Sequence, residues 1–206
     1  DRADGVLYTS DGRDVEMAVP STKAFYAQIA AGYLLAVAIA EQWGEAPDQE
    51  LLAAMAGLPE AMTTTLATRP AIAEAAHTWT PSRRYWAMVG NGTNRIAAEE
   101  LRIKLSELCY KSIACDATED KKHVDLSSEP MILVCAAGLT GSNADDVAKE
   151  VAIYKAHKAA PIVIATEGEQ RFAAALAVLT VPATHPLLAF VLGTMVGHLF
   201  GYEAAL

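Results

Sequence analysis

The sequence predicts an α/β fold in which an open, doubly wound, parallel five-stranded sheet is flanked by helices. From position 85 onward, short apolar runs alternate with longer segments of helical periodicity, which is typical of parallel strands joined by crossover helices. Glycine-containing turns follow the first and third apolar runs and mark the change from strand to helix. Because crossovers between parallel strands are right-handed, these elements are expected to form one sheet with helices packed on it.

The elements of this sheet domain follow from the spacing of the apolar residues. Strands are predicted at 85–89, 112–115, 131–135, 161–165 and 177–181. Helices are predicted at 96–110, 144–158 and 187–201. In the last helix Gly193, Gly197 and Gly201 recur every four residues, which predicts close backbone approach to another element or to another subunit. Ligands of such sheets bind beyond the carboxyl ends of the strands, where the strand order reverses.

The first region of the chain is predicted to span residues 1–58 and to be helical. Ser21 and Thr22 can cap a helix that runs from about Lys23 to Gln42. That helix is apolar nearly all round, so we expect it to be buried on most sides.

Prolines divide the chain after this first region. Pro59, Pro70 and Pro81 separate alanine-rich stretches, which predicts a helical linker over 59–82 that is packed between domains. The sheet domain then occupies 83–206.

Composition excludes several classes of protein. The 206 residues are 52% hydrophobic, enough for a sizeable core, and the net charge of −9 argues against nucleic acid as a partner. Cys109, Cys115 and Cys135 show no metal-ligand spacing and suit buried thiols in a reducing cytoplasm. The longest uncharged stretch, Thr184–Tyr202, contains two His, a Pro and three Gly, which favours a buried helix over a membrane span.

The helix predicted at 96–110 carries two stripes. One is apolar and suits burial against a sheet: Ala97, Leu101, Leu105 and Leu108. The other places Glu100, Lys104 and Glu107 on one face at helical spacing. Such a stripe is either a solvated face with helix-supporting ion pairs or an amine and a carboxylate held at the mouth of the sheet for proton transfer and imine chemistry.

A resemblance supports the second interpretation. The motif elements, in chain order, are Gly90-x-Gly92-x-Asn94, Glu100-x3-Lys104-x2-Glu107 and Lys122-His123. This order resembles the second sugar-isomerase (SIS) domain of the glucosamine-6-phosphate synthases, which are glutamine-dependent fructose-6-phosphate amidotransferases. No gap is needed between Gly90 and His123.

A second segment is similar to the same family. Residues 16–28 match the E-x-x-V-A-S-T-K-A-F-x-x-Q motif that ends the first SIS domain, with Pro20 in place of the family's alanine. The resemblance therefore implies an SIS-type sheet domain preceded by the helical end of a first SIS domain. It also implies a longer protein, with a glutaminase domain and most of the first SIS domain upstream, and we expect these 206 residues alone to be inactive.

The resemblance also implies roles for individual residues. Lys104 would form or assist an imine at the carbonyl of fructose 6-phosphate, and Glu107 would move a proton between adjacent sugar carbons. His123 would assist ring opening from a neighbouring subunit of a homodimer, although Val124-Asp125 replaces the family's Gly-Pro after it. The residues implied to bind the phosphosugar substrate are Ser21, Thr22, Lys23 and Glu100.

Two loops admit more than one interpretation. The segment 137–143 joins a strand to a helix and offers Thr140 and Ser142 to a phosphate, or it is an ordinary turn whose helix end is satisfied by the aspartates that follow. The turn at Gly90 could instead begin a dinucleotide fold with Asp116 as the ribose acid, but Arg95 replaces the third glycine.

No metal and no cofactor is expected, because His, Cys and carboxylates do not occur together at ligand spacing. The predicted function is the phosphosugar isomerase region of an amidotransferase, located in the cytoplasm and acting without membrane or nucleic-acid partners. A deglycase or another phosphosugar isomerase of the SIS family, and a non-catalytic module that senses a phosphosugar, remain open as alternatives.

Overall fold

The computed structural model describes residues 3–10 and 19–206. They form two compact units that meet in the sequence between Ala56 and Gly57, and each unit is described by itself. The start of the motif at Glu16 lies outside the described residues.

The first unit contains helix α1, Lys23–Gln42, at the bounds predicted from the sequence. The expected burial of α1 is wrong, since none of its residues is buried and Leu34 is 55% exposed. The described part of this unit adds only the start of α2, which offers too little apolar surface to cover a helix of 20 residues. Among the described residues, α1 is also the one helix long and apolar enough to cross a membrane, a property that core helices of soluble proteins share.

The segment 59–82 is largely helical, but Pro59 does not separate two helical stretches as expected. Helix α2 spans Gln49–Ala67 with Pro59 inside it, and helix α3 spans Arg69–Trp79. Pro59 does not end α2 because alanines and other good helix formers surround it, so the loss of one backbone hydrogen bond is tolerated. Pro70 stands in the first turn of α3, where proline fits a helix start. The assignment of these residues to particular SIS domains stays a prediction.

The second unit is built on one five-stranded parallel sheet, as predicted. Its strands are β1 Trp86–Gly90, β2 Ala114–Asp116, β3 Met131–Cys135, β4 Ala160–Thr166 and β5 Ala177–Val181. The order β2-β1-β3-β4-β5 reverses direction between β1 and β3. Every residue of β1 and β3 is buried, as expected for parallel strands covered on both faces.

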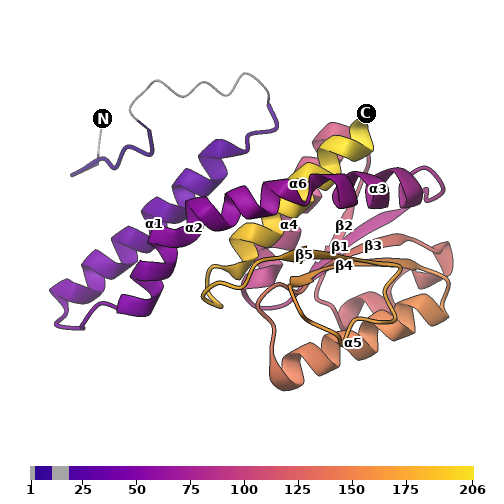
Figure 1. Ribbon diagram of the computed structural model, residues 1–206. Coiled ribbons are helices and arrows are strands. Elements are labelled where there is room, and N and C mark those ends of the chain that lie inside the picture. The colour runs from indigo at the N-terminus through magenta and orange to yellow at the C-terminus, as the bar shows by residue number, and fades with distance from the viewer. Residues whose placement is uncertain (1–2, 11–18) are drawn as a thin grey trace. The chain divides into compact units, whose positions relative to one another are not determined.

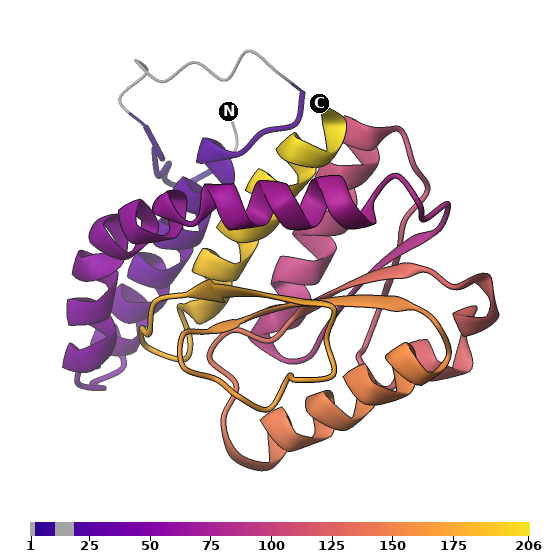
Figure 2. The same cartoon turned by 45° about the vertical axis from the view of Figure 1, so that its right-hand side comes forward.

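Helices cover both faces of this sheet. The crossover helices are α4 Thr93–Cys109 and α5 Gly141–Ala156, and a third helix, α6 Ala189–Ala205, follows the last strand. Helices α3, α4 and α6 lie on one face and α5 lies on the other (Figures 1 and 2). Helix α4 starts three residues before the predicted position because Gly92, with φ of 56°, turns the chain directly from strand into helix. Two short 3₁₀ helices, Asp120–His123 and Leu126–Ser128, lie between β2 and β3.

Glycines of α6 bring it close to α4, as their spacing predicted. A Cβ atom on Gly197 would collide with the side chain of Leu101, and one on Gly201 would lie 2.8 Å from Leu105 Cδ1. Both leucines are fully buried on the apolar stripe of α4. The two helix backbones therefore approach each other more closely than larger residues would allow.

We expect Gly197→Ala to lower the free energy of unfolding by about 1–3 kcal/mol, because the added methyl group overpacks the contact with Leu101. Gly193→Ala is the matched control, since a Cβ there would lie 3.6 Å from Ala137 Cβ, an ordinary contact. Urea unfolding followed by circular dichroism measures both changes. Equal stability of the two variants would contradict the close approach.

Candidate functional site

A cleft lies at the carboxyl edge of the sheet, where the strand order reverses. It has a volume of about 600 Å³ and is lined by 91–94, 118–119, 137–139, 186–187 and one side of α5. The loops after β1 and β3 therefore meet as the sequence predicted.

Hydrogen bonds between side chains and the backbone hold the two loops of this cleft in place. The side-chain amide of Asn94 donates to the carbonyl oxygen of Ala137 at 2.9 Å. The backbone N–H of Gly138 donates to Thr166 Oγ1, also at 2.9 Å. Gly138 has φ of 75°, and a Cβ on it would lie 2.6 Å from Ala189 Cβ, so a larger residue would strain this turn.

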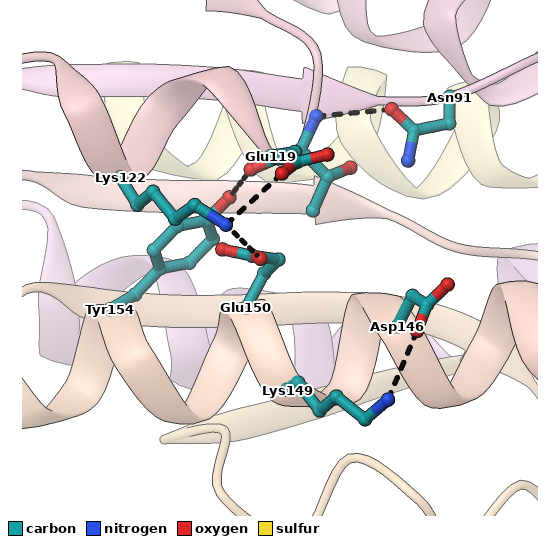
Figure 3. Close-up of polar contacts among 8 residues, drawn as sticks. Asn91, Glu119, Lys122, Asp146, Lys149, Glu150 and Tyr154 are labelled. Atoms are coloured by element: carbon teal, nitrogen blue, oxygen red, sulfur yellow. Dashed lines mark hydrogen bonds and ion pairs between the residues drawn. The ribbon is translucent and has the colours of Figure 1, made fainter.

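Charged side chains form the wall of the cleft on the side of α5 (Figure 3). Lys122 Nζ lies 2.7 Å from Glu150 Oε1 and 3.3 Å from Glu119 Oε1. The hydroxyl of Tyr154 donates to the carbonyl oxygen of Thr118, and burial raises the pKa of Tyr154, with Glu150 adding to the effect. The segment before His123 is thereby tied to α5.

The predicted phosphate ligands of this edge lie outside the cleft. Thr140 and Ser142 are exposed at the start of α5, and the lining residue there is Asn143. The two aspartates expected to satisfy this helix end form ion pairs with basic side chains. Asp145 pairs with Arg171, and Asp146 pairs with Lys149. Phosphate binding by Thr140 and Ser142 stays a prediction.

The charged stripe of α4 forms a compact cluster. Lys104 Nζ lies 3.4 Å from Glu100 Oε1 and 3.5 Å from Glu107 Oε2. The exposed fractions of the side chains are 7% for Lys104, 12% for Glu100 and 32% for Glu107. The stripe is therefore not a solvated face, and Lys104 is held beside two carboxylates. A role for these residues in proton transfer or imine chemistry stays a prediction.

The position of this cluster differs from the expectation. None of its three residues lines the cleft at the edge of the sheet. Lys104 stands eleven residues after Thr93 on α4, roughly 16 Å along the helix axis. The cluster belongs to the layer of helices, beside α6.

A histidine that the sequence analysis did not select completes the cluster. His198 on α6 is buried, and its Nε2 atom lies 3.1 Å from Glu100 Oε1. Burial disfavours the charged form of Glu100, yet the hydrogen bond with His198 and the charge of Lys104 together outweigh it, so the pKa of Glu100 lies below its usual value. The available signal was the position of His198 next to Gly197, in a helix predicted to pack closely on another element.

The remaining predicted site residues do not join this cluster. His123 lies away from it in the same unit, and Ser21, Thr22 and Lys23 belong to the other unit. His123 is exposed at the end of a 3₁₀ helix whose Lys122 pairs with Glu150 of α5, and α5 lies on the opposite face of the sheet from α4 (Figure 1). One chain therefore does not bring His123 to Lys104. Ser21, Thr22 and Lys23 belong to the first unit, with Thr22 at the N-cap position of α1, and their place beside a substrate stays a prediction.

Metal and dinucleotide sites find no geometric support in the described part of the chain. Residues 3–10 and 19–206 contain no group of three or more His, Cys, Asp or Glu side chains suited to a metal ion. Asp116, the candidate ribose acid, lies 3.6 Å from Lys121 Nζ and does not line the cleft. The three cysteines are free thiols, and burial raises the pKa of Cys135.

The fold is a doubly wound α/β domain with a five-stranded parallel sheet, and comparison with known proteins specifies it further. The structure superposes on the C-terminal domain of glucosamine-fructose-6-phosphate aminotransferase from Francisella tularensis with a TM-score of 0.80 at 21% identity, covering 93% of this chain and 55% of that one. It also superposes on the sugar isomerase domain of an RpiR transcription factor from Sphaerobacter thermophilus with a TM-score of 0.60 at 15% identity, covering 77% of this chain and 90% of that one. No family model matches the chain.

Two sequence relatives carry the identification. The chain is 31% identical over 198 residues to the glutamine–fructose-6-phosphate aminotransferase (isomerizing) of Streptococcus pyogenes serotype M3, covering 93% of this chain and 32% of that protein. It is 31% identical over 206 residues to the enzyme of the same name from Thermus thermophilus, covering 97% and 33%. The chain is therefore homologous to the SIS isomerase region of the glutamine–fructose-6-phosphate aminotransferases, and it spans about a third of their length.

Replacing Glu100 by glutamine removes the carboxylate whose pKa the cluster lowers. Such a group stabilises the fold above its unfolded pKa, about 4.3, and this contribution is lost as the pH falls through the lower pKa of the folded state. We expect Glu100→Gln to be less stable than the parent at pH 7, with a difference that shrinks below about pH 4.

Thermal unfolding across this pH range measures the difference. Glu99→Gln, on the exposed side of α4, is the control and should change stability little at any pH. A Glu100→Gln difference of the same size at pH 7 and about pH 3 would mean that the carboxylate is not stabilised in its ionised form.

Proposed function

We propose that this chain is the isomerase region of a glutamine–fructose-6-phosphate aminotransferase-like enzyme, which converts fructose 6-phosphate to glucosamine 6-phosphate in amino-sugar biosynthesis. The observation that carries the proposal is the Lys104 amine, buried beside two carboxylates at the motif spacing. The homology to enzymes of that name supports the same reaction.

The cluster has the groups that the reaction needs. Lys104 forms an imine at C2 of the open-chain sugar and releases water, and ammonia then displaces the Lys104 amine from C2. If Lys104 only assists, ammonia condenses with C2 directly and the same water is released. Glu107, the more exposed of the two carboxylates, takes a proton from C1 and returns it to C2, which turns the ketose imine into the aldose amine. Its carboxylate lies 3.5 Å from Lys104 Nζ, so the two groups can also exchange a proton.

Other parts of the site complete the proposal. Ser21, Thr22, Lys23 and Glu100 bind the phosphosugar. Thr140 and Ser142 are not part of this proposal, because α5 lies on the other face of the sheet from α4 and they do not reach a sugar held at Lys104 of the same chain. His123 acts from the partner chain of a homodimer, which suits its exposed position on a loop that is tied to α5. Ammonia comes from glutamine hydrolysis in a glutaminase domain of the longer, cytoplasmic protein.

The test of this function is Glu107→Gln in the full-length protein, assayed for glucosamine 6-phosphate. We expect kcat to fall by about 100-fold or more while KM changes little, because the proton transfer is lost and the sugar contacts remain. Glu99→Gln on the exposed side of the same helix is the matched control and should keep full turnover.

The alternatives give different results in the same experiment. A phosphosugar-sensing module would bind fructose 6-phosphate without any turnover in the parent protein. A deglycase would release a sugar from a glycated amine and leave fructose 6-phosphate unchanged. Full activity of Glu107→Gln would contradict the role of Glu107.

A further inference from the structure

We propose that His198 is a positioning residue that acts through Glu100 to hold the amine of Lys104 for reaction. The inference rests on the proposed function and adds a residue that lies outside the charged stripe of α4. It assigns a role to a buried imidazole on α6 that is in contact with that stripe.

The evidence is one carboxylate oxygen shared by two donors. Oε1 of Glu100 lies 3.1 Å from His198 Nε2 and 3.4 Å from Lys104 Nζ. Both donor side chains are only 7% exposed, so water competes little for the oxygen. The imidazole and the amine therefore both fix the rotamer of Glu100.

The ionised carboxylate of Glu100 determines which ring nitrogen of His198 donates the hydrogen bond. The pKa of Glu100 lies below its usual value, so the carboxylate is ionised near neutral pH and only accepts hydrogen bonds. Nε2 of His198 must then carry a proton and donate it to Oε1. If His198 is replaced by a side chain that has no hydrogen-bond donor near Glu100 Oε1, only Lys104 still holds Glu100.

The packing of α6 determines where this donor stands. Gly197 precedes His198 and approaches the side chain of Leu101, the residue that follows Glu100 on α4. This contact fixes the separation of the two helices at the level of the hydrogen bond. His198 can therefore reach Glu100 from a backbone that has little freedom to shift.

The expected consequence of losing His198 is a misplaced amine. Glu100 becomes free to rotate, and Lys104 then has one fixed carboxylate partner, Glu107, instead of two. A misplaced reacting group slows the chemical step more than it weakens sugar binding. The effect is therefore expected in kcat and not in KM.

The experiment compares three replacements of His198 in the full-length protein, with fructose 6-phosphate and glutamine as substrates. His198→Leu should lower kcat by about tenfold or more with little change in KM, since it removes a hydrogen bond to a charged group. His198→Gln, which keeps an N–H donor near the position of Nε2, should recover most of the activity. His198→Asn places its donor nearer to the helix and should behave like the leucine variant.

A double mutant tests whether the effect passes through Glu100. Adding His198→Leu to Glu100→Gln should cost little beyond the loss caused by Glu100→Gln alone. The control is His157→Gln at the exposed C-cap of α5, which should leave kcat unchanged. Additive losses, or equal activity of the leucine and glutamine variants, would overturn the inference.

A second readout does not depend on turnover. The carboxyl carbon of Glu100, followed by NMR, should titrate at a higher pH in His198→Leu than in the parent, and His198→Gln should resemble the parent. Absence of turnover in the parent protein would refute the proposed function, and this titration would still decide the inference. Identical midpoints in all variants would overturn it.

Discussion

The burial of the Lys104 ammonium is the constraint around which the helix layer of this protein is arranged. A charged amine with 7% exposure is stable only when carboxylates and hydrogen bonds compensate for lost water. Glu100 and Glu107 supply the carboxylates from the same helix, and α6 covers the group because its glycines permit a close approach. The same features that hide the amine from water also hold it in one place.

The chain keeps two polar regions apart. The cleft at the edge of the sheet is formed by loops and by the wall of α5. The amine and its carboxylates belong to α4, a helix on the opposite face of the sheet from α5. Open α/β sheets usually bind ligands at the edge, and the sequence analysis placed both features there. The i, i+4, i+7 stripe correctly put three side chains on one face of a helix, but it could not say whether that face looked toward the loops or toward α6.

Local patterns predicted most of the fold. One error, at Pro59, arose from a competition between local helix preferences, and the other arose where distant parts of the chain meet. The alternation of apolar runs and helical segments determined all five strands to within two residues. Pro59 was misplaced because proline is a strong helix breaker on average, and its alanine-rich surroundings outweighed that tendency. His198 was missed because its partner Glu100 lies 98 residues away, and only the packing of α6 on α4 brings them together.

The most direct test of this account is to trap the sugar on Lys104. The full-length protein would be treated with borohydride in the presence of fructose 6-phosphate, and the labelled lysine would be located by mass spectrometry. The account predicts a reduced sugar adduct on Lys104 that disappears in Lys104→Met, while exposed lysines such as Lys149 gain no comparable label. Labelling of exposed lysines to the same extent as Lys104 would contradict the claim that this buried amine is the reactive one.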